Sequence, residues 1–407
     1  MSKIKLYRIE SKIYVEEGKT ENNQFLDDIN MLLMDQNIEL TEDVDNPYLN
    51  VVLVESGGSE EQFLQIKDSL ISPIILINNG RHNSLAASLE IKTYISTKMK
   101  YECILFSGAP DKIAEILTTM NTVFQTKEEL KGTRLGVIGK PSNWLIASDV
   151  NYKEVYDRFG IELIDIDYDE FRLEIDKKSF PQISEYFELS EKVSSLEELD
   201  KAFYIYGAIS RLISKYNLSG FTVRCFDLLD LYKTTSCIAL SIFNKQGYTA
   251  TCEGDIPAMI TQHIVNKISG YSSFQANPSY FFYEKGQVLF AHCQVPLNMC
   301  GEYELDTHFE SDLSLAVAGK FINGKCSVIK LSPDLKTYIA FPGEIVESPN
   351  IKGYCRSQMK IAFDQRGFIS FFSEHFGNHV IICYGDITND FVSLMEFINS
   401  DYDRKNK

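Results

Sequence analysis

The feature that most constrains the fold of this chain is a regular alternation of apolar runs and amphipathic segments near its start. Each apolar run is short enough to be one strand, and the segment after it has helical periodicity and begins near an Asn, Ser or Asp that can cap a helix. Such alternation is typical of a parallel, doubly wound sheet. We therefore expect an α/β domain over residues 1–131. The strand-like runs are "IKLYRI", "LNVVLVES", "PIILIN" and "ECILFSG".

The pattern restarts at "KGTRLGVIGKPSNW" and changes again near residue 270. The restart predicts a second doubly wound α/β domain over residues 132–270. Over residues 271–407, strand-like runs are joined by turns that contain Gly or Asn, which is typical of an antiparallel sheet or barrel. The expected fold class is therefore α/β, with two doubly wound α/β domains followed by a β-rich, barrel-like C-terminal domain. The final "SDYDRKNK" is expected to fray.

The composition limits the kinds of ligand and the cellular compartment that we expect for this chain. The chain has 57 acidic and 40 basic residues and a formal net charge of −17. It therefore repels phosphate backbones, so we expect no nucleic acid partner, and a neutral small molecule or a divalent cation suits it better. No apolar run reaches the ~18 residues of a membrane helix, and no signal peptide is apparent. The nine cysteines form no CxxC pair. We expect a cytoplasmic protein with no membrane partner.

Two carboxylates lie at a predicted strand-to-helix turn in "TCEGDIPAMITQHIVNK". Asp255 directly precedes apolar positions at helical spacing, with Pro257 in the first turn, so it suits the N-cap of a helix. Glu253 closes a strand at the carboxyl edge of the sheet, where open α/β sheets bind ligands. The two residues can be a cap and a surface charge, or they can hold a metal and move a proton.

Three of the six histidines are candidates for a site. His292 lies within a strand-like run, where a polar side chain needs a partner, and His308 lies in the acidic segment "LDTHFES". His379 lies in "SEHFGNHVIICYGD", whose apolar end predicts a join between a loop and a strand rather than a zinc-binding helix. Each of these histidines can be a ligand or a hydrogen-bonded structural residue.

Two further side chains follow predicted strands. Trp144 comes after "GVIGKPSN", which lacks the spacing of a phosphate-binding loop. Its ring can stack on a sugar or pack in the interior. Arg81, in "NNGRHNSL", can bind an anionic group or be an exposed residue at a helix start. No G-x-S-x-G elbow is present, and nothing marks Cys252 or Cys293 as activated, so a covalent mechanism is disfavoured.

Three segments, taken in order, resemble the L-fucose isomerase-like family and, more distantly, the arabinose isomerases. The resemblance extends from about Gly132 to Asp386 and agrees with the predicted order of domains. It implies a metal-dependent ketol isomerase, which interconverts an aldose and a ketose through an enediol. The segments are "CFDLLDLYKTTSCIALSIFNKQGYTATCEGDIPAMITQHIVNKISG", "FQANPSYFFYEKGQVLFAHCQVP" and "FGNHVIICYGD".

The resemblance also implies a set of site residues. In that family a divalent metal, usually Mn²⁺, is held by carboxylates and histidine, and two carboxylates move protons. Glu253 stands at the first carboxylate position, His379 at the late histidine position, and His292 at a histidine ligand of the arabinose branch. Asp255 is a second candidate for proton transfer. The candidates for contact with the sugar, from their places in the chain, are His308, Trp144 and Arg81.

The sequence departs from the family pattern at Asn277, where a second carboxylate is expected. An asparagine can bind a metal through its carbonyl oxygen, but it cannot act as a base. Asp255, Glu310 or a metal-bound water would have to complete the proton transfer.

Three hypotheses about function therefore stay open at this point. The chain can be a sugar isomerase, a metal-dependent sugar or sugar-acid lyase or epimerase, or a non-catalytic sugar-binding relative. The family forms ring-like trimers or hexamers, with sites completed by a neighbouring N-terminal domain. The resemblance thus implies a homotrimer or homohexamer as well.

Overall fold

A computed structural model describes residues 1–12, 16–45 and 47–405, which fold into two compact units. The units are Met1–Glu128 and Glu129–Lys407. Each unit is described by itself below. The three domain ranges given above stay predictions.

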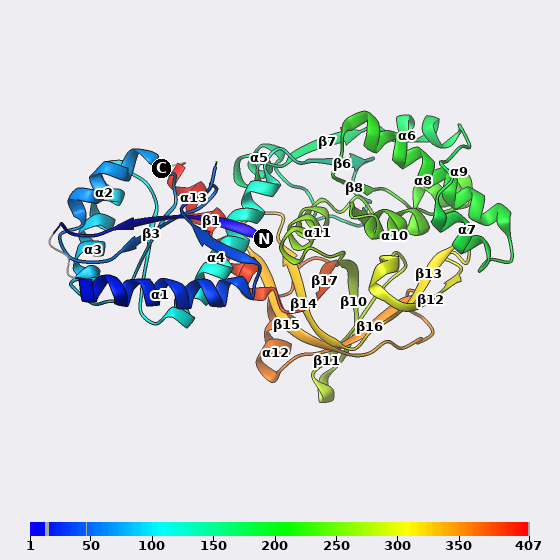
Figure 1. Cartoon of the computed structure of the whole chain (residues 1–407). Helices are drawn as coiled ribbons and strands as arrows, with labels where there is room; N and C mark the ends of the chain where they lie inside the picture. Colours follow the sequence, from blue (N-terminus) through cyan, green and yellow to red (C-terminus); the bar gives the residue numbers. More distant parts are fainter. Residues whose placement is uncertain (13–15, 46, 406–407) are drawn as a thin grey trace. The chain divides into compact units, whose positions relative to one another are not determined.

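The N-terminal unit is built on a five-stranded sheet in the order β2-β1-β3-β4-β5, with every strand pair parallel (Figure 1). Every residue of β3 and of β4 is buried, as expected for strands covered by helices on both faces. The expected doubly wound sheet is present, with β2 as an additional strand. The elements are β1 (Ser2–Ile9), α1 (Glu16–Met34), β2 (Ile38–Thr41), β3 (Asn50–Val54), α2 (Glu60–Ile66), β4 (Ile74–Asn78), α3 (Ser84–Tyr94), β5 (Cys103–Ser107) and α4 (Pro110–Leu130).

The helix caps differ from the expectation in this unit. Ser59 and Asn83 occupy the N-cap positions of α2 and α3, but neither side chain makes a capping hydrogen bond. The backbone of Asn83 is left-handed there, with φ +58°, which is not the extended conformation of a capping residue. The prediction that these residues cap their helices is therefore wrong.

The second unit begins with a four-stranded parallel sheet in the order β7-β6-β8-β9. Because the strands are parallel, their carboxyl ends lie at one edge, and β9 ends there directly before Glu253. The elements are β6 (Arg134–Ile138), α5 (Tyr152–Phe159), β7 (Glu162–Ile166), α6 (Tyr168–Ile175), α7 (Ser184–Ser190), α8 (Leu196–Tyr216), β8 (Gly220–Val223), α9 (Asp227–Tyr232), α10 (Cys237–Lys245), β9 (Thr249–Cys252) and α11 (Ile256–Ser269).

The rest of the second unit is a closed six-stranded barrel in the order β10-β11-β16-β15-β14-β17, together with a two-stranded sheet of β12 and β13 (Figure 1). The fold class predicted from the sequence is confirmed. The elements are β10 (Phe274–Phe282), β11 (Gln287–His292), β12 (Cys300–Asp306), β13 (Ala316–Phe321), β14 (Gly324–Leu331), β15 (Tyr338–Glu347), β16 (Ser357–Ala362), α12 (Gln365–Glu374), β17 (Val380–Tyr384) and α13 (Thr388–Lys405).

The predicted fraying of the C-terminal tail is wrong as far as Lys405, because α13 continues to that residue. The helix is held by apolar side chains that are buried along one face, Phe391, Leu394 and Ile398 among them. The last two residues, 406 and 407, lie outside the described part of the chain.

One apolar core joins the parallel sheet of the second unit to its barrel. It contains Phe221 of β8 and Cys252 of β9 together with Phe274 of β10, Phe290 of β11 and Ile382 of β17. Burial of such side chains stabilises the unit, and the shared core fixes the end of β9 against the barrel. Across the described residues, no helix combines the length and the apolar character that spanning a membrane requires.

Candidate metal centre

The turn after β9 has a backbone that few residues adopt. Glu253 has φ +66° and Gly254 has φ +72°. The left-handed conformation costs a residue other than glycine roughly 1–2 kcal/mol, and strained residues of this kind cluster at functional sites. A Cβ atom on Gly254 would lie 2.8 Å from the carbonyl oxygen of Lys140 and from Cα of Pro141, so this position needs glycine. The turn therefore holds Glu253 in one fixed orientation.

Asp255 caps α11, as its place in the sequence predicts, and it also contacts a histidine. Its Oδ1 accepts from the backbone N–H of Ala258 at 2.9 Å. Its Oδ2 lies 2.8 Å from Nδ1 of His379, which is 124 positions further along the chain. Both oxygens of this buried carboxylate are thus engaged. The proposed acid–base role of Asp255 stays a prediction, while its observed contacts orient the imidazole.

The register of the barrel explains why residues distant in sequence meet near Glu253. Strand β10 lies between β11 and β17 and pairs Asn277 with Ala291 and Ala276 with Val380. His292 directly follows Ala291, and His379 directly precedes Val380. His292, at the end of β11, and His379, directly before β17, therefore lie on either side of Asn277 on the strand between them.

A buried glutamine ties the parallel sheet to this end of the barrel. The Oε1 atom of Gln275, on β10, accepts from the backbone N–H of Cys252 at 2.7 Å. Its carbonyl oxygen and its Oε1 each lie 3.3 Å from Nε2 of Gln294. All three residues are buried, so the contact fixes the last residue of β9, and with it Glu253, against the strands that carry the histidines. Gln275 is not among the residues predicted from the sequence. Its only distinguishing feature in the sequence is that it is a polar residue within an apolar strand.

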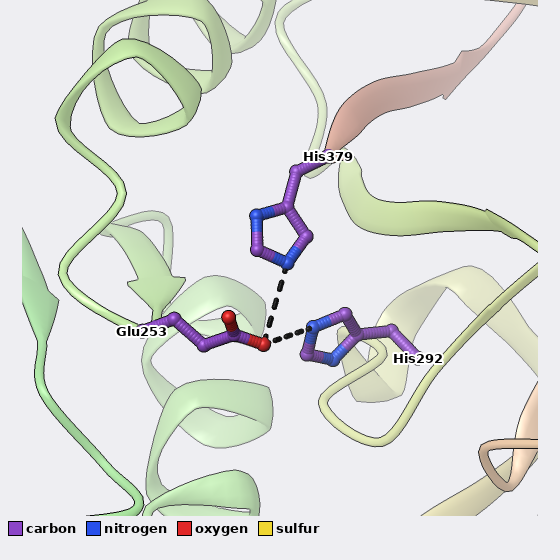
Figure 2. Close-up of side chains that lie close together, drawn as sticks. All are labelled: Glu253, His292 and His379. Carbon is purple, nitrogen blue, oxygen red and sulfur yellow. Dashed lines mark ion pairs between the residues drawn. The ribbon is translucent and has the colours of Figure 1, made fainter. Parts of the chain in front are cut away.

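Glu253, His292 and His379 converge (Figure 2). The Oε1 atom of Glu253 lies 3.5 Å from Nε2 of His379 and 3.9 Å from Nε2 of His292. One ligand atom from each residue lies within 4.8 Å of the others. The residues are 7%, 5% and 0% exposed for Glu253, His292 and His379. The structure therefore brings together a carboxylate and two imidazoles, three of the four residues that the resemblance implied at the metal.

The charges of the three groups depend strongly on one another. Burial alone would raise the pKa of Glu253, but His379, His292 and the Trp144 N–H outweigh it and lower that pKa to about 2. Burial would likewise lower the pKa of His379, yet Asp255 and Glu253 raise it to about 9. Burial lowers the pKa of His292 to about 3, with the charge of His379 adding to the effect. His379 also lowers the pKa of Asp255. These shifts favour ionised Glu253 and Asp255, a charged His379 and a neutral His292 at neutral pH.

Two buried nitrogen atoms at this centre have no hydrogen-bond partner. Whether a metal fits the site can be judged from these atoms, because a cation would bind them. They are Nε2 of His379 and Nε2 of His292. An unpaired buried polar atom costs roughly 1–3 kcal/mol, and a ligand between these atoms and Glu253 would remove that cost. Donor atoms bound at ~2.1 Å from one cation lie roughly 3–3.4 Å apart. The observed separations of 3.5 and 3.9 Å from Glu253 Oε1 are longer, so the side chains would draw together around a cation. A carboxylate with two imidazoles suits Mn²⁺, Zn²⁺ or a related dication.

The two imidazoles differ in how ready they are to bind a cation. Asp255 accepts the Nδ1 proton of His379, so Nε2 of that ring can present its lone pair once the ring is neutral. In His292, Nδ1 accepts from the backbone N–H of Cys293 at 3.0 Å. This contact places the proton of the neutral ring on Nε2. A cation bound at His292 Nε2 therefore requires the proton to move to Nδ1 and the Cys293 contact to break.

Trp144 contacts the same carboxylate. Its Nε1–H donates to Oε2 of Glu253 at 2.6 Å, and the indole packs edge-on against Phe226 with ring centroids 4.9 Å apart. Trp144 is half exposed. The structure thus places it against Glu253, where it orients the carboxylate. Contact of its ring with a sugar stays a prediction.

Asn277 and His308 line a cavity of about 30 Å³ together with Glu253 and His292. The imidazole of His308 packs edge-on against Phe226, and its Nδ1 lies 3.0 Å from Oγ of Ser311. A cavity of this volume holds an ion or one or two waters. Asn277 therefore lies on the wall of the same cavity as Glu253 and His292. Its role as a metal ligand stays a prediction.

Five of the nine cysteines line this cavity, although the sequence marked none of them as part of a site. Sγ of Cys225 lies 2.9 Å from Sγ of Cys252, directly before Glu253. Their spacing in the chain is irregular, so only the folded chain could show that they gather here. The five are Cys225, Cys237, Cys252, Cys293 and Cys355.

Arg81 belongs to the N-terminal unit, so its place relative to this centre is not described. Its Nη1 donates to Oε1 of Glu21 at 2.7 Å, and its side chain is exposed. Both residues line a hollow of about 580 Å³ at the carboxyl edge of the first sheet, together with Asn79. Binding of a substrate anion by Arg81 stays a prediction.

Comparisons with known proteins give relatives among the sugar isomerases. No protein family model matches the chain. A sulfoquinovose isomerase of Alkalicoccus urumqiensis is 22% identical over 269 residues, which cover 62% of this chain and 61% of that protein. A sulfoquinovose isomerase of Priestia aryabhattai and one of Priestia megaterium are each 22% identical over 313 residues, 72% of this chain and 69% of theirs. The chain thus spans between three fifths and seven tenths of the length of these curated relatives, and it is similar to sugar isomerases.

Proposed function

We propose that this chain is a metal-dependent sugar ketol isomerase, which interconverts an aldose and a ketose through an enediol. The observation that carries the proposal is the buried set of Glu253, His292 and His379, in which two imidazole nitrogens face one carboxylate oxygen and have no hydrogen-bond partner. The similarity to sulfoquinovose isomerases supports the same reaction class. It also makes sulfoquinovose the first sugar to test.

The residues that would hold the metal are Glu253, His379 and His292, with Asn277 able to add its carbonyl oxygen. We propose Mn²⁺, or another divalent metal, as the cofactor. When bound, such a cation polarises the carbonyl and hydroxyl oxygens of the sugar and stabilises the negative charge of an enediolate. Asn277 carries no charge, so this donor set attracts a dication less strongly than one with a second carboxylate.

Residues of this chain orient the proposed metal ligands and exclude water from the site. Trp144 holds Oε2 of Glu253, which leaves Oε1 directed at the two imidazoles. Asp255 holds Nδ1 of His379 and so directs Nε2 of that ring toward Glu253. Burial of the three groups excludes water, which strengthens each electrostatic contact among them. We propose Glu253 as both a ligand and a group that transfers protons, with His308 and Trp144 at the sugar.

The cavity volume of about 30 Å³ adds a requirement. Pockets for small organic ligands measure roughly 300–1,000 Å³, so the lining side chains have to move apart when a sugar binds. His308 and Trp144 both pack against Phe226, and a movement of that ring would widen the cavity from two sides.

The location and the assembly are also proposals. We propose a cytoplasmic homotrimer or homohexamer that acts on a small-molecule sugar, with no nucleic acid or membrane partner. The support is the resemblance of residues 132–386 to ring-forming isomerases and the net charge of −17. Light scattering on the purified protein measures the assembly directly.

The test of the proposed function is turnover with a defined metal. The protein is stripped of metal, loaded with Mn²⁺, and incubated with a panel of aldoses and ketoses that includes sulfoquinovose. We expect one metal per chain and the conversion of at least one aldose to its ketose, with both lost in Glu253→Gln. A protein that binds Mn²⁺ stoichiometrically and converts no sugar of the panel would refute the isomerase proposal.

One observation favours a second candidate. Asn277 cannot transfer a proton, so the same centre could begin with an enediolate and end with a different bond broken, as in a metal-dependent sugar or sugar-acid lyase or epimerase. Product analysis separates the possibilities, because a lyase gives two fragments and an epimerase gives an aldose of inverted configuration. A non-catalytic sugar-binding relative would bind a sugar of the panel without converting it and would keep that affinity in Glu253→Gln.

A further inference from the structure

The isomerase proposed above needs a second group that transfers protons, and two of the obvious residues are poorly suited to supply it. Asn277 has an amide, which is not a base. Asp255 has both carboxylate oxygens engaged, by the N–H of Ala258 and by His379, and it is not among the residues that line the cavity. The second group has to be sought on the cavity wall.

Glu310 lies on that wall. Among the described residues that line the cavity, the carboxylates are Glu253 and Glu310. Glu310 is part of the turn that connects β12 to β13, and it is exposed. We propose that Glu310 is the second catalytic acid–base residue of this site and does what Asn277 cannot do. The inference rests on the proposed function and would extend it by one residue.

The turn that carries Glu310 is braced rather than loose. Arg356 donates from Nε to the carbonyl oxygen of Thr307 at 2.7 Å and from Nη2 to Oγ1 of the same residue at 3.0 Å. It also forms ion pairs with Asp306 at 3.4 Å and Asp312 at 3.5 Å, one on each side of the turn. A group that transfers protons has to be held near one position, and Arg356 limits the movement of this segment.

Contacts within the turn restrain it further. The backbone N–H of His308 donates to the carbonyl oxygen of Leu313 at 3.0 Å, and that of Asp312 donates to the carbonyl oxygen of His308 at 2.9 Å. Nδ1 of His308 lies 3.0 Å from Oγ of Ser311. Glu310 thus stands between two residues that are bonded to each other, which keeps its backbone beside the cavity.

The surroundings of the two cavity carboxylates differ. Glu253 lies beside the two histidines and accepts a hydrogen bond from Trp144. Glu310 lies beside none of these groups in the contacts of the described residues, and burial raises its pKa. A carboxyl group with a raised pKa keeps a proton more readily and can serve as the acid of a site.

The proton balance assigns each carboxylate one role. Glu253 takes the proton from C2 of the aldose while the carboxyl group of Glu310 gives its proton to O1, and the C–H electron pair becomes the C1–C2 double bond of the enediol. Glu253 then returns its proton to C1 while Glu310 takes the proton from O2, and C2 becomes a carbonyl. C1 is reduced, C2 is oxidised, both carboxyl groups regain their starting states, and the sugar keeps its composition.

The test compares two glutamate-to-glutamine changes in the Mn²⁺-loaded protein. Glu310→Gln removes the proposed acid–base group, while Glu304→Gln changes an exposed carboxylate on β12 that does not line the cavity. We expect kcat on the converted sugar to fall 10²- to 10⁴-fold in Glu310→Gln, with Mn²⁺ affinity within about threefold of the unmodified chain. Glu304→Gln should keep kcat within about twofold. In Glu310→Ala, added formate should restore part of the lost kcat.

Three results would overturn the inference, and they are distinct. If the unmodified protein converts sugar and Glu310→Gln keeps kcat within about threefold, Glu310 has no such role, and the isomerase proposal stands. If His308→Gln, rather than Glu310→Gln, lowers kcat a hundredfold, the imidazole is the second group. If the unmodified Mn²⁺-loaded protein converts no sugar at all, the isomerase proposal fails, and the role of Glu310 fails with it.

Discussion

Both parallel sheets of this chain have polar residues at their carboxyl edges, but these residues make different contacts in the two sheets. In the N-terminal unit, Glu55 follows β3 and accepts from Nε of Arg8 on β1 at 2.6 Å. Asn78 at the end of β4 donates to Ser88 and accepts from Ser107. These residues bond to strands and helices of their own sheet, and Oε2 of Glu55 is buried there without a hydrogen-bond partner.

At the edge of the second sheet, Glu253 faces side chains from a different structure, the barrel. There Nε2 of His292 and Nε2 of His379 are buried without a hydrogen-bond partner. A strand end therefore becomes a candidate site when another part of the fold places donor atoms beside it that have no hydrogen-bond partner. The same chemical change at the two edges should therefore have different consequences.

The largest expected effect comes from matched substitutions at the two strand ends. Glu253→Gln removes the carboxylate that faces both histidines, so turnover should fall at least ~10³-fold and Mn²⁺ affinity at least ~100-fold. Glu55→Gln weakens a buried pair with Arg8, so the free energy of unfolding should fall by about 1–2 kcal/mol while the folded protein keeps its turnover. Kinetics, metal titration and urea unfolding measure the three quantities. Equal loss of turnover in both variants would remove the distinction between the edges.

A second pair of variants separates helix capping from support of the metal centre. Asp255→Asn can still cap α11, but it cannot accept the Nδ1 proton of His379 in the same way, so Mn²⁺ affinity should fall about 10- to 100-fold. Asp364→Asn, at the N-cap of α12, changes a cap that touches no histidine, so the affinity should not change. Calorimetric titration of both variants tests this. An unchanged Mn²⁺ affinity in Asp255→Asn would mean that Asp255 only caps α11 and does not support the metal centre.

The third prediction concerns pH. His379 has its pKa raised to about 9 by Asp255 and Glu253, so below that pH a proton occupies the ring and competes with a metal. As pH falls, Mn²⁺ affinity should drop about tenfold per unit below pH 9 and level off above it. His292, with its pKa lowered to about 3, should add nothing near neutral pH. One proton per metal is therefore expected to be released at pH 7, measured by titration in several buffers.

The pH slope has its own control. In Asp255→Asn one of the two groups that raise the pKa of His379 is gone, so the slope should flatten toward pH 9. The same shift acts on stability without metal: a histidine pKa raised from 6.5 to about 9 stabilises the fold fully below pH 6.5, and this contribution is lost as pH rises through 9. A release of two protons at pH 7 would contradict the assigned charges.

The smallest expected effect is that of Trp144→Phe. The change removes one hydrogen bond, from Nε1 to Oε2 of Glu253, at a half-exposed position, so turnover should fall about 5- to 10-fold with little change in stability. Tyr152→Phe removes a similar bond, to Oδ1 of Asp165 elsewhere in this unit, and should leave turnover unchanged. If both variants behave alike, the indole does not orient Glu253.

The sequence predicted most elements because their patterns are local. The buried strands β3 and β4 are continuous apolar runs, and α8 shows its period over 21 residues. Strand β2 was missed because four residues, Ile38–Thr41, carry too short a pattern. The tail was misjudged because its polar residues conceal the buried face of α13, which only packing shows.

The sequence by itself determined that Glu253 stands at the end of a strand before a capped helix, since strand, turn and cap signals all lie within a few neighbouring residues. Through the resemblance, it also identified His292 and His379 as candidate metal ligands. Only the tertiary structure decided that Asp255 holds His379, that Trp144 holds Glu253, and that two imidazole nitrogens are left unpaired. The two hydrogen bonds join residues more than 100 positions apart. The register of β11, β10 and β17 brings the two histidines together. Hydrogen bonds and metal ligation depend on distances of a few ångströms, which local patterns in a sequence do not fix.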